Sequence, residues 1–386
     1  MRFSRTLLAL SSILSLKAAP APPPMSIIHR SEKNAATGAG HFVRVADAPL
    51  LFTPQVFSAD PQAEARADTL GALAALERVL VAGGSDFTRV VRLHAYVARE
   101  EAVAIVEAVV AARFAAALPA FTLVRTPLTA PRAIVAFEAV AVTDDAASTA
   151  AVARWGAAIL PAGGKIFISG QAEKGTDLAS AVSLTMAGLH RSVAHLGLKK
   201  TDIVQVRAFI TPFADHLAAR RAVLASFEGA EAPPLSLVEW VSDLYAEIEI
   251  VVSARALANF REPITYDWFP WLTKSPRYCH IATVAAGTPL VFISAITSAS
   301  ERGPREQMKL IFEGLGSALF EAGSSYRNLA KATYYLADPA ARSVLGDIRG
   351  VYFDPMRPPA ASALGVKSLG HAGRAASVEI VAVPVK

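Results

Sequence analysis

The sequence is poor in cysteine, in charge and in long apolar runs. Its single cysteine, Cys279, excludes an intrachain disulfide and any cysteine-rich metal site. Charged residues make up 18% of the 386 residues and hydrophobic residues 53%, yet no apolar run reaches the roughly 18 residues that a membrane helix needs. We therefore expect no membrane span, and we expect the apolar surplus to lie in buried contacts between folded units.

Patterns for metal, cofactor and nucleic-acid binding are also missing. The eight histidines are scattered and no HExxH pattern occurs. The formal net charge of +5 is small, and no block of Lys and Arg is interleaved with aromatic residues. The sequence therefore predicts no metal, no cofactor and no nucleic-acid partner.

The N-terminus has the order of residues found in secretory signal peptides. Arg2 and Arg5 precede a short apolar stretch over 6–16, and small and proline-rich sequence follows over 17–24. This order predicts that residues 1–24 are a signal peptide and that the protein is exported, to the periplasm or out of the cell. Met25 is an alternative start, and a chain that begins there would be cytoplasmic.

The most informative feature present is one block of sequence that occurs three times. In each copy a glycine closes a helical stretch and a later proline opens a strand, at nearly equal spacings: Gly84, Gly197 and Gly323, and Pro119, Pro233 and Pro359. Between these anchors the apolar residues superpose as an i, i+3, i+7 helical stripe, such as Leu73, Leu76 and Leu80 in the first copy. Chance does not keep such a stripe in register through three copies, so one supersecondary unit is used three times.

Each copy predicts the order β-β-α-β-α-β-β, an α+β layer with helices on one face of a mostly antiparallel sheet. We expect units at 41–143, 151–255 and 277–386. The first two strands of each unit are expected to form a hairpin: 41–47 with 50–53, 151–158 with 165–169, and 278–284 with 290–294. Residues 256–276 are expected to be a linker whose four aromatic side chains pack onto a neighbouring unit.

The second copy carries the motifs that identify a family. They are Ser169-Gly170-Gln171, the Gly197 turn, Pro233-Pro234-Leu235-Ser236 and Ala246-Glu247-Ile248-Glu249-Ile250. In these motifs the chain resembles the Rid family, also called the YjgF/YER057c/UK114 or L-PSP endoribonuclease family, as three tandem copies. Single-domain members are homotrimers with a small-molecule cleft at each subunit interface. The resemblance therefore implies an intramolecular pseudo-trimer made of one monomeric chain, and hydrolysis of amino-acid imines and enamines such as 2-aminoacrylate.

In the family, the arginine of a Pro-Ala-Arg-Ser motif binds the substrate carboxylate, as a guanidinium does in bidentate fashion. This chain has Phe121, Leu235 and Ala361 at the three matching positions. Because losing such a contact typically costs several kcal/mol, ordinary imino-acid hydrolysis is expected to be lost or altered. The ligand is then expected to be a less anionic imine, enamine or apolar carbonyl compound.

The other polar residues of the family site persist best in the second copy. The resemblance gives the water-positioning role to Glu247, whose counterparts are Ala136 and Ser377. We expect a working cleft to be built partly from the second copy. The candidate ligand-binding residues are Ser169, Gly170, Gln171, Leu235, Ser236, Glu239, Phe121 and Arg125.

Three arginines are alternative partners for a ligand or for these carboxylates. Arg125 shares a strand face with Phe121 and would reach the same cleft. Arg357 precedes the third proline motif, and Arg207, with counterparts His94 and Thr333, is placed on the inner face of the pseudo-trimer. Plain ion pairs between these arginines and Glu239 or Glu247 are the competing interpretation.

Two classes of function remain open from the sequence. The first is a Rid-like small-molecule site, altered in specificity or catalytically silent, and the second is a non-catalytic binding or scaffold protein. An endoribonuclease is disfavoured because no basic and aromatic track occurs, and an amidohydrolase would need a Ser/Lys pair in each copy. An open pocket with convergent polar groups distinguishes the first class from the second.

Overall fold

The computed structural model describes residues 25–28, 42–115, 117–144, 149–255, 257, 262–298 and 302–384. The predicted signal peptide at 1–24 lies outside the described residues, as does part of the predicted linker. Within the described ranges no helix is long and apolar enough to cross a membrane.

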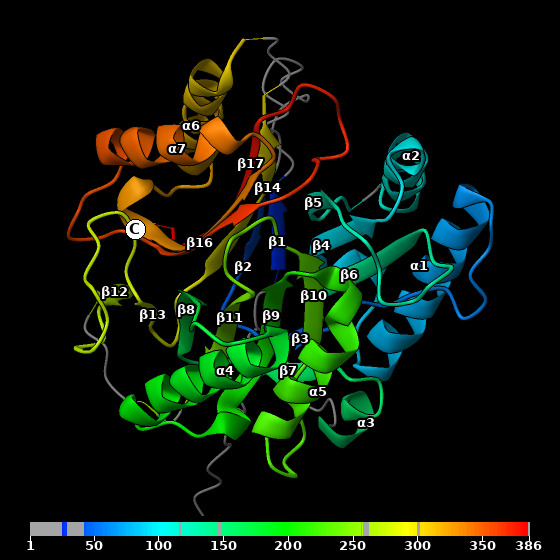
Figure 1. The fold of residues 1–386 in the computed structure, drawn as a ribbon, viewed down its shortest axis with the longest axis horizontal. Coiled ribbons are helices and arrows are strands. Elements are labelled where there is room, and N and C mark those ends of the chain that lie inside the picture. Colours follow the sequence, from blue (N-terminus) through cyan, green and yellow to red (C-terminus); the bar gives the residue numbers. More distant parts are fainter. Residues whose placement is uncertain are drawn as a thin grey trace, which may run out of the picture.

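Three units of sheet and helix make up the molecule (Figure 1), in the α+β class and the order of elements that the sequence predicts. The first unit contains β2 (Phe42–Val45), β3 (Leu50–Phe52), α1 (Ala65–Ala82), β4 (Val90–Val97), α2 (Val103–Arg113), β5 (Ala120–Arg125) and β6 (Val135–Val142). The second contains α3 (Thr149–Ala153), β7 (Ala158–Leu160), β8 (Lys165–Gln171), α4 (Leu178–His195), β9 (Ile203–Ile210), α5 (His216–Ser226), β10 (Leu235–Glu239) and β11 (Ala246–Ser253). The third contains β12 (Ile264–Asp267), β13 (Ile281–Val284), β14 (Leu290–Thr297), α6 (Pro304–Glu321), β15 (Leu329–Leu336), α7 (Pro339–Tyr352), β16 (Ala360–Gly365) and β17 (Ala376–Ala382). Strand β1 (Met25–Ile28) precedes them, and single turns of 3₁₀-helix lie at Phe87–Arg89, Glu100–Ala102, Lys200–Asp202, Phe213–Asp215 and Tyr326–Asn328.

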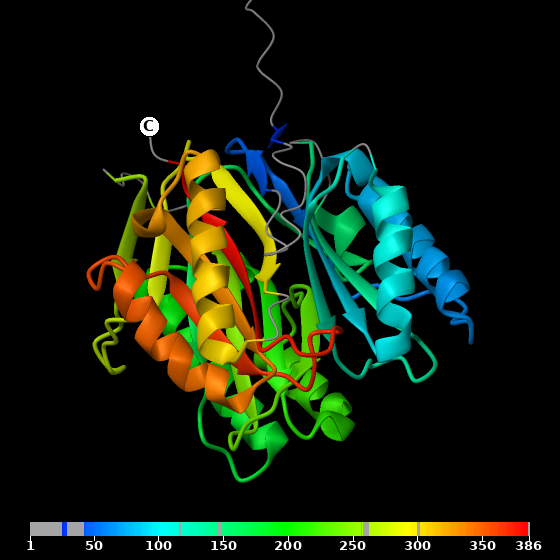
Figure 2. The same cartoon turned by 90° about the horizontal axis from the view of Figure 1, so that it is seen from above.

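The helices lie on the outside and the sheets face one another inside (Figure 2). The predicted stripe of α1 is buried against its sheet, because Leu73, Leu76 and Leu80 are all at most 3% exposed. The glycines that close α1, α4 and α6 are Gly84, Gly197 and Gly323, with φ values of 68°, 74° and 70°. This left-handed conformation favours glycine and ends the helix, which explains why the same residue recurs in all three copies.

One strand near the start of each unit pairs with the sheet of another unit. Strand β2 pairs with β14, β7 with β3, and β13 with β8. The three sheets therefore have the orders β1-β2-β14-β17-β15-β16, β5-β4-β6-β3-β7 and β10-β9-β11-β8-β13-β12. Because β2 completes the sheet of the third unit, the three units close into a ring.

The predicted hairpins are therefore wrong. Strands β2 and β3 lie in different sheets, and residues 151–153 of the second predicted hairpin lie in α3 instead of a strand. An apolar pattern predicts that a strand is buried, but it does not predict which of three similar sheets the strand joins. Strand β12 also forms inside the predicted linker and pairs with β13.

The strands β5, β10 and β16 each lie at the edge of a sheet, beside another unit. Ser294 Oγ accepts from the Phe121 N–H at 3.1 Å, and Ser169 Oγ accepts from the Ala361 N–H at 2.7 Å. Gln55 Nε2 donates to the Leu237 carbonyl at 3.0 Å. Side chains of the neighbouring unit thus satisfy backbone groups that an open sheet edge would leave unpaired.

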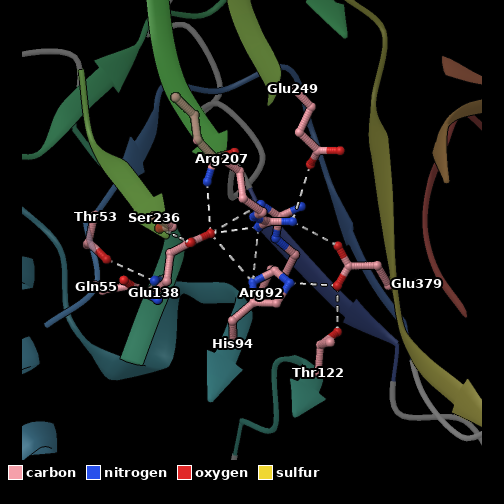
Figure 3. A network of polar contacts seen from close by, with 12 residues as sticks. Thr53, Gln55, Arg92, His94, Thr122, Glu138, Arg207, Ser236, Glu249 and Glu379 are labelled. Atoms are coloured by element: carbon pink, nitrogen blue, oxygen red, sulfur yellow. Dashed lines mark hydrogen bonds and ion pairs between the residues drawn. The ribbon is translucent and has the colours of Figure 1, made fainter. Parts of the chain in front are cut away.

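A polar cluster fills the centre of the ring, where Glu138, Glu249 and Glu379 occupy equivalent positions on β6, β11 and β17 (Figure 3). Arg207 reaches all three carboxylates, with nitrogen to oxygen distances of 2.7, 3.4 and 3.3 Å respectively. Burial opposes the ionisation of Glu138, but the charge of Arg207 and its neighbours outweighs it and holds the pKa of Glu138 at about 2. The predicted inner position of Arg207 is confirmed, and one arginine serves three carboxylates.

Candidate functional site

The three boundaries between units can be compared directly, because each places an edge strand of one unit beside the segment of another unit that corresponds to 169–171, at the end of β8. We call them the first–second, second–third and third–first seams. In the first–second seam the amide of Gln55 pairs with the backbone of Leu237 in both directions, at 3.0 and 3.3 Å. This amide occupies the edge of β10 and leaves no polar group of Gln55 directed at a ligand.

In the third–first seam apolar groups replace the polar loop. Ile296, at the position of the glutamine, is fully buried in the core of the third unit. Phe121 is half-buried against the core of the first unit. Arg125 Nε lies 3.9 Å from Glu100 Oε2 of the same unit.

The second–third seam contains a cavity of about 180 Å³. It is lined by residues 169–173, which include Ser169, Gly170 and Gln171, and by Leu272, Thr273, Tyr278 and His280. Here Gln171 does not reach the edge strand, because its Nε2 donates to Ser192 Oγ on α4 at 3.2 Å. Ser169 is fixed at the boundary by the Ala361 N–H and by donating to the Cys279 carbonyl at 2.5 Å. We call this cavity, with Glu247 beside it, the second–third cleft.

Glu247 lies directly against Gly170, which lines the cavity. A methyl group at Gly170 would overlap the Glu247 carboxylate, so glycine is what admits that carboxylate. Burial, followed by the charge of Glu249, raises the pKa of Glu247 to about 7, against the opposing effects of Lys331 and Arg342. Both protonation states are therefore populated near neutral pH, as general acid–base chemistry requires.

The segment predicted as an aromatic linker forms one wall of the cleft. Phe269 is buried in the core of the second unit and stacks on Trp271 at a centroid distance of 5.1 Å, which confirms the predicted packing. His280 Nδ1 accepts from the Phe269 N–H at 3.1 Å. Burial lowers the pKa of His280, so the ring is neutral near pH 7 with its proton on Nε2.

Comparison with known proteins identifies the family. Residues 283–386 match the model of the family described as Endoribonuclease L-PSP. The third unit belongs to this family, the Rid family. The match begins in β13 and covers the third unit, and the first two units repeat its order of elements.

Solved structures, among them YjgF-family proteins, each match a part of this chain. A YjgF-family protein from Neisseria meningitidis is 19% identical and covers 32% of this chain and 96% of its own, with a TM-score of 0.25. The YjgF gene product of Escherichia coli is 28% identical and covers 24% and 83%, with a TM-score of 0.23. Escherichia coli TdcF, solved with bound serine, is 25% identical and covers 23% and 80%, with a TM-score of 0.22. No curated protein matches the chain.

The structure divides the predicted site residues among different places. Ser169, Gly170, Gln171 and Glu247 come together in the second–third cleft. Leu235 does not join them, because it is buried in the core of the second unit beside the first–second seam. The edge strand that faces Ser169 is β16, so the position of the missing Rid arginine in this cleft is Ala361.

Two further predicted ligand-binding residues have structural partners instead. Ser236 donates its hydroxyl to Glu138 in the central cluster. Glu239 forms an ion pair with Lys367 at 2.7 Å, and its N–H donates to Thr126 Oγ1 at 2.9 Å. These contacts are made between units, which the pattern within one copy does not reveal.

Tyr278 and His280 were missed by the sequence analysis. Both residues precede β13. They lie at the cavity because β13 pairs with β8 of the second unit, and only that pairing would have identified them as site residues. Across the described ranges no group of three or more His, Cys, Asp or Glu side chains is arranged to hold a metal ion.

Proposed function

We propose that the second–third cleft binds a small imine, enamine or related carbonyl compound, and that Glu247 carries the proton in its hydrolysis. One observation carries the proposal. The Glu247 carboxyl has a pKa of about 7, and it lies against Gly170, which lines the cavity. A general base works best when its pKa lies near the operating pH.

The reaction needs one water and no cofactor. Glu247, as the carboxylate, accepts a proton from water while the water oxygen forms a bond to the carbon of the C=N group. The same carboxyl group then returns that proton to the nitrogen, which gives a carbinolamine. It next transfers the hydroxyl proton of the carbinolamine to the nitrogen, the C=O bond forms as the C–N bond breaks, and ammonia and a carbonyl compound are released. The wall formed by Leu272, Thr273, Tyr278 and His280 limits access of other water to this carbon.

The residue at 361 supports an altered substrate choice. Alanine at this position offers no charge to a carboxylate placed beside the C=N group. We therefore expect only trace acceleration of 2-aminoacrylate hydrolysis, and faster turnover of imines that need no charged contact at Ala361.

The test is an imine-trapping assay in which an amino-acid oxidase supplies several imino acids. The wild type is expected to lower the amount of trapped imine for at least one of them. Glu247→Gln is expected to lose about 10²- to 10⁴-fold in rate, the usual contribution of a general acid–base group. Glu231→Gln, which removes an exposed carboxylate of the same unit, is the matched control and should behave as the wild type.

Two outcomes contradict the proposal. One is a folded wild type that accelerates none of the imines, which would favour a binding or scaffold role. The other is full activity in a folded Glu247→Gln variant. Wild-type hydrolysis of 2-aminoacrylate as fast as that of an arginine-bearing Rid protein would instead contradict the role given to Ala361.

A further inference from the structure

The backbone groups at the outer edge of β16 form three hydrogen bonds. Two of them are to the second unit, and the third is to an arginine side chain of the third unit itself. Ala361 N–H donates to Ser169 of the second unit, and Gly365 O accepts from the Val241 N–H of the second unit at 2.9 Å. Between them, the Ala363 carbonyl accepts from Arg342 Nη2 at 3.1 Å. The guanidinium of Arg342 therefore lies in the second–third seam, although Arg342 belongs to the first turn of α7 in the third unit.

The equivalent contact in the first–second seam shows what Arg342 replaces. There the carbonyl that corresponds to Ala363 O is Leu237 O, and it accepts from Gln55 of the neighbouring unit. In the second–third seam the corresponding glutamine is Gln171, which is held by Ser192 instead. An exposed cation thus stands where the other seam has a neutral amide.

The position of Arg342 in its helix carries an arginine in the third unit only. The helices α2, α5 and α7 end in register at Phe114, Phe227 and Phe353, so the residues that correspond to Arg342 are Val103 and His216. The third unit alone places an arginine at this point of a seam. It is the same seam that contains the cavity and Glu247.

The surroundings leave this guanidinium available to an anion. Arg342 is exposed, and within the part of the chain that the structure describes its hydrogen-bond partner is one backbone carbonyl. An arginine carries five N–H donors in a planar fork, so a carboxylate has donors left to bind. The positive charge of Arg342 also acts on Glu247, lowering the pKa of that carboxyl against the larger effect of burial.

The side chains along the edge strand between these groups are small. Residues 361, 363 and 365 are alanine, alanine and glycine. Two residues of a strand span about 7 Å, so the Arg342 contact lies that far along β16 from the position that bears the arginine in Rid proteins.

We propose that Arg342 is the anion-binding residue of the second–third cleft, and that the cleft takes monoanionic carbonyl or imine compounds whose acid group is several bonds from the reacting carbon. This inference rests on the proposed function of the cleft. Arg342 binds the distant acid group, and the reacting carbon lies at Gly170, facing Glu247.

The test compares the binding of three probes by isothermal titration: pyruvate, 4-oxopentanoate, and the methyl ester of 4-oxopentanoate. The wild type is expected to bind 4-oxopentanoate about tenfold or more tightly than either of the others, as for one charge-assisted contact. Arg342→Gln is expected to lose that advantage and to leave the affinity for the ester unchanged. Arg305→Gln, which removes an exposed arginine of α6 paired with Asp347, is the matched control and should bind as the wild type.

The outcomes separate the two proposals. If Arg342→Gln binds 4-oxopentanoate as the wild type does, while Gly170→Ala abolishes binding, the cleft stands and the role of Arg342 is overturned. Binding that neither substitution changes overturns the site as well, and so does a folded wild type that binds none of the three probes. Thermal denaturation of each variant shows whether it is folded.

Discussion

Ala361→Arg is the substitution that most sharply tests which units form the cleft. Ala361 is 7% exposed, and its N–H is bonded to Ser169 at 2.7 Å, so an arginine there starts at the loop that keeps Gly170 and Gln171. A charge-assisted hydrogen bond to a carboxylate contributes about 1.5–3 kcal/mol. Each 1.4 kcal/mol is about tenfold in rate, so kcat/KM for 2-aminoacrylate should rise by about 10- to 100-fold over the wild type.

The matched controls are the same substitution in the other two seams. Leu235→Arg introduces a charge into the buried core of the second unit beside Gln55, and Phe121→Arg faces a seam without the glutamate. Neither should raise activity, although the sequence places Leu235 in the same copy as Gln171 and Glu247. Burying an unpaired charge costs several kcal/mol, so urea denaturation must show that each variant is folded.

The assay is hydrolysis of 2-aminoacrylate, measured by the disappearance of trapped imine. A gain in folded Leu235→Arg with no gain in folded Ala361→Arg would refute the assignment of the cleft to the second and third units. No gain in any folded variant would refute the claim that the missing arginine limits this reaction.

Three further predictions concern stability and assembly. Glu247 has a pKa raised to about 7, so its contribution to stability is fully present below pH 4.5 and is lost as the pH rises through 7. Urea unfolding should therefore show the wild type losing about 2–3 kcal/mol relative to Glu247→Gln between pH 5 and pH 8, and a constant difference would contradict the environment assigned to Glu247. Arg207→Met leaves three buried carboxylates without their shared cation and should lower the free energy of unfolding by about 3–5 kcal/mol at pH 7. Adding Glu138→Gln should recover part of this loss. An unchanged unfolding midpoint would show that Arg207 does not stabilise the central cluster. Light scattering should give one chain per particle, because each unit already has the other two as neighbours, and three chains per particle would contradict the closed ring.

The sequence predicts the parts of this fold that depend on local periodicity. The buried stripe of α1 and the glycines at 84, 197 and 323 are readable from residue spacing, because helix packing and helix ends are determined within about 20 residues of chain. The inner position of Arg207 also followed from comparing it with His94 and Thr333.

The sequence does not predict contacts that join different copies. The motif around Ser169 and the motif around Leu235 belong to one copy, yet the structure places them in different seams because each edge strand docks on another unit. The same exchange brings His280 to the cleft through β13. A signal for the central cluster was present, since each copy has a glutamate at the same place in a mostly apolar strand, at 138, 249 and 379, although the strand of the second copy also contains Glu247. Their meeting at one point depends on the closure of the ring.

The pH dependence of hydrolysis tests the role of Glu247 most directly. For the imine that the wild type turns over fastest, kcat/KM should rise with pH and level off with an apparent pKa near 7, because the carboxylate form of Glu247 accepts the proton from water. In Glu247→Gln the rate should be low and this pKa should be absent. A folded Glu247→Gln variant that keeps the wild-type profile would contradict the assignment of the chemistry to this residue and to the second–third cleft.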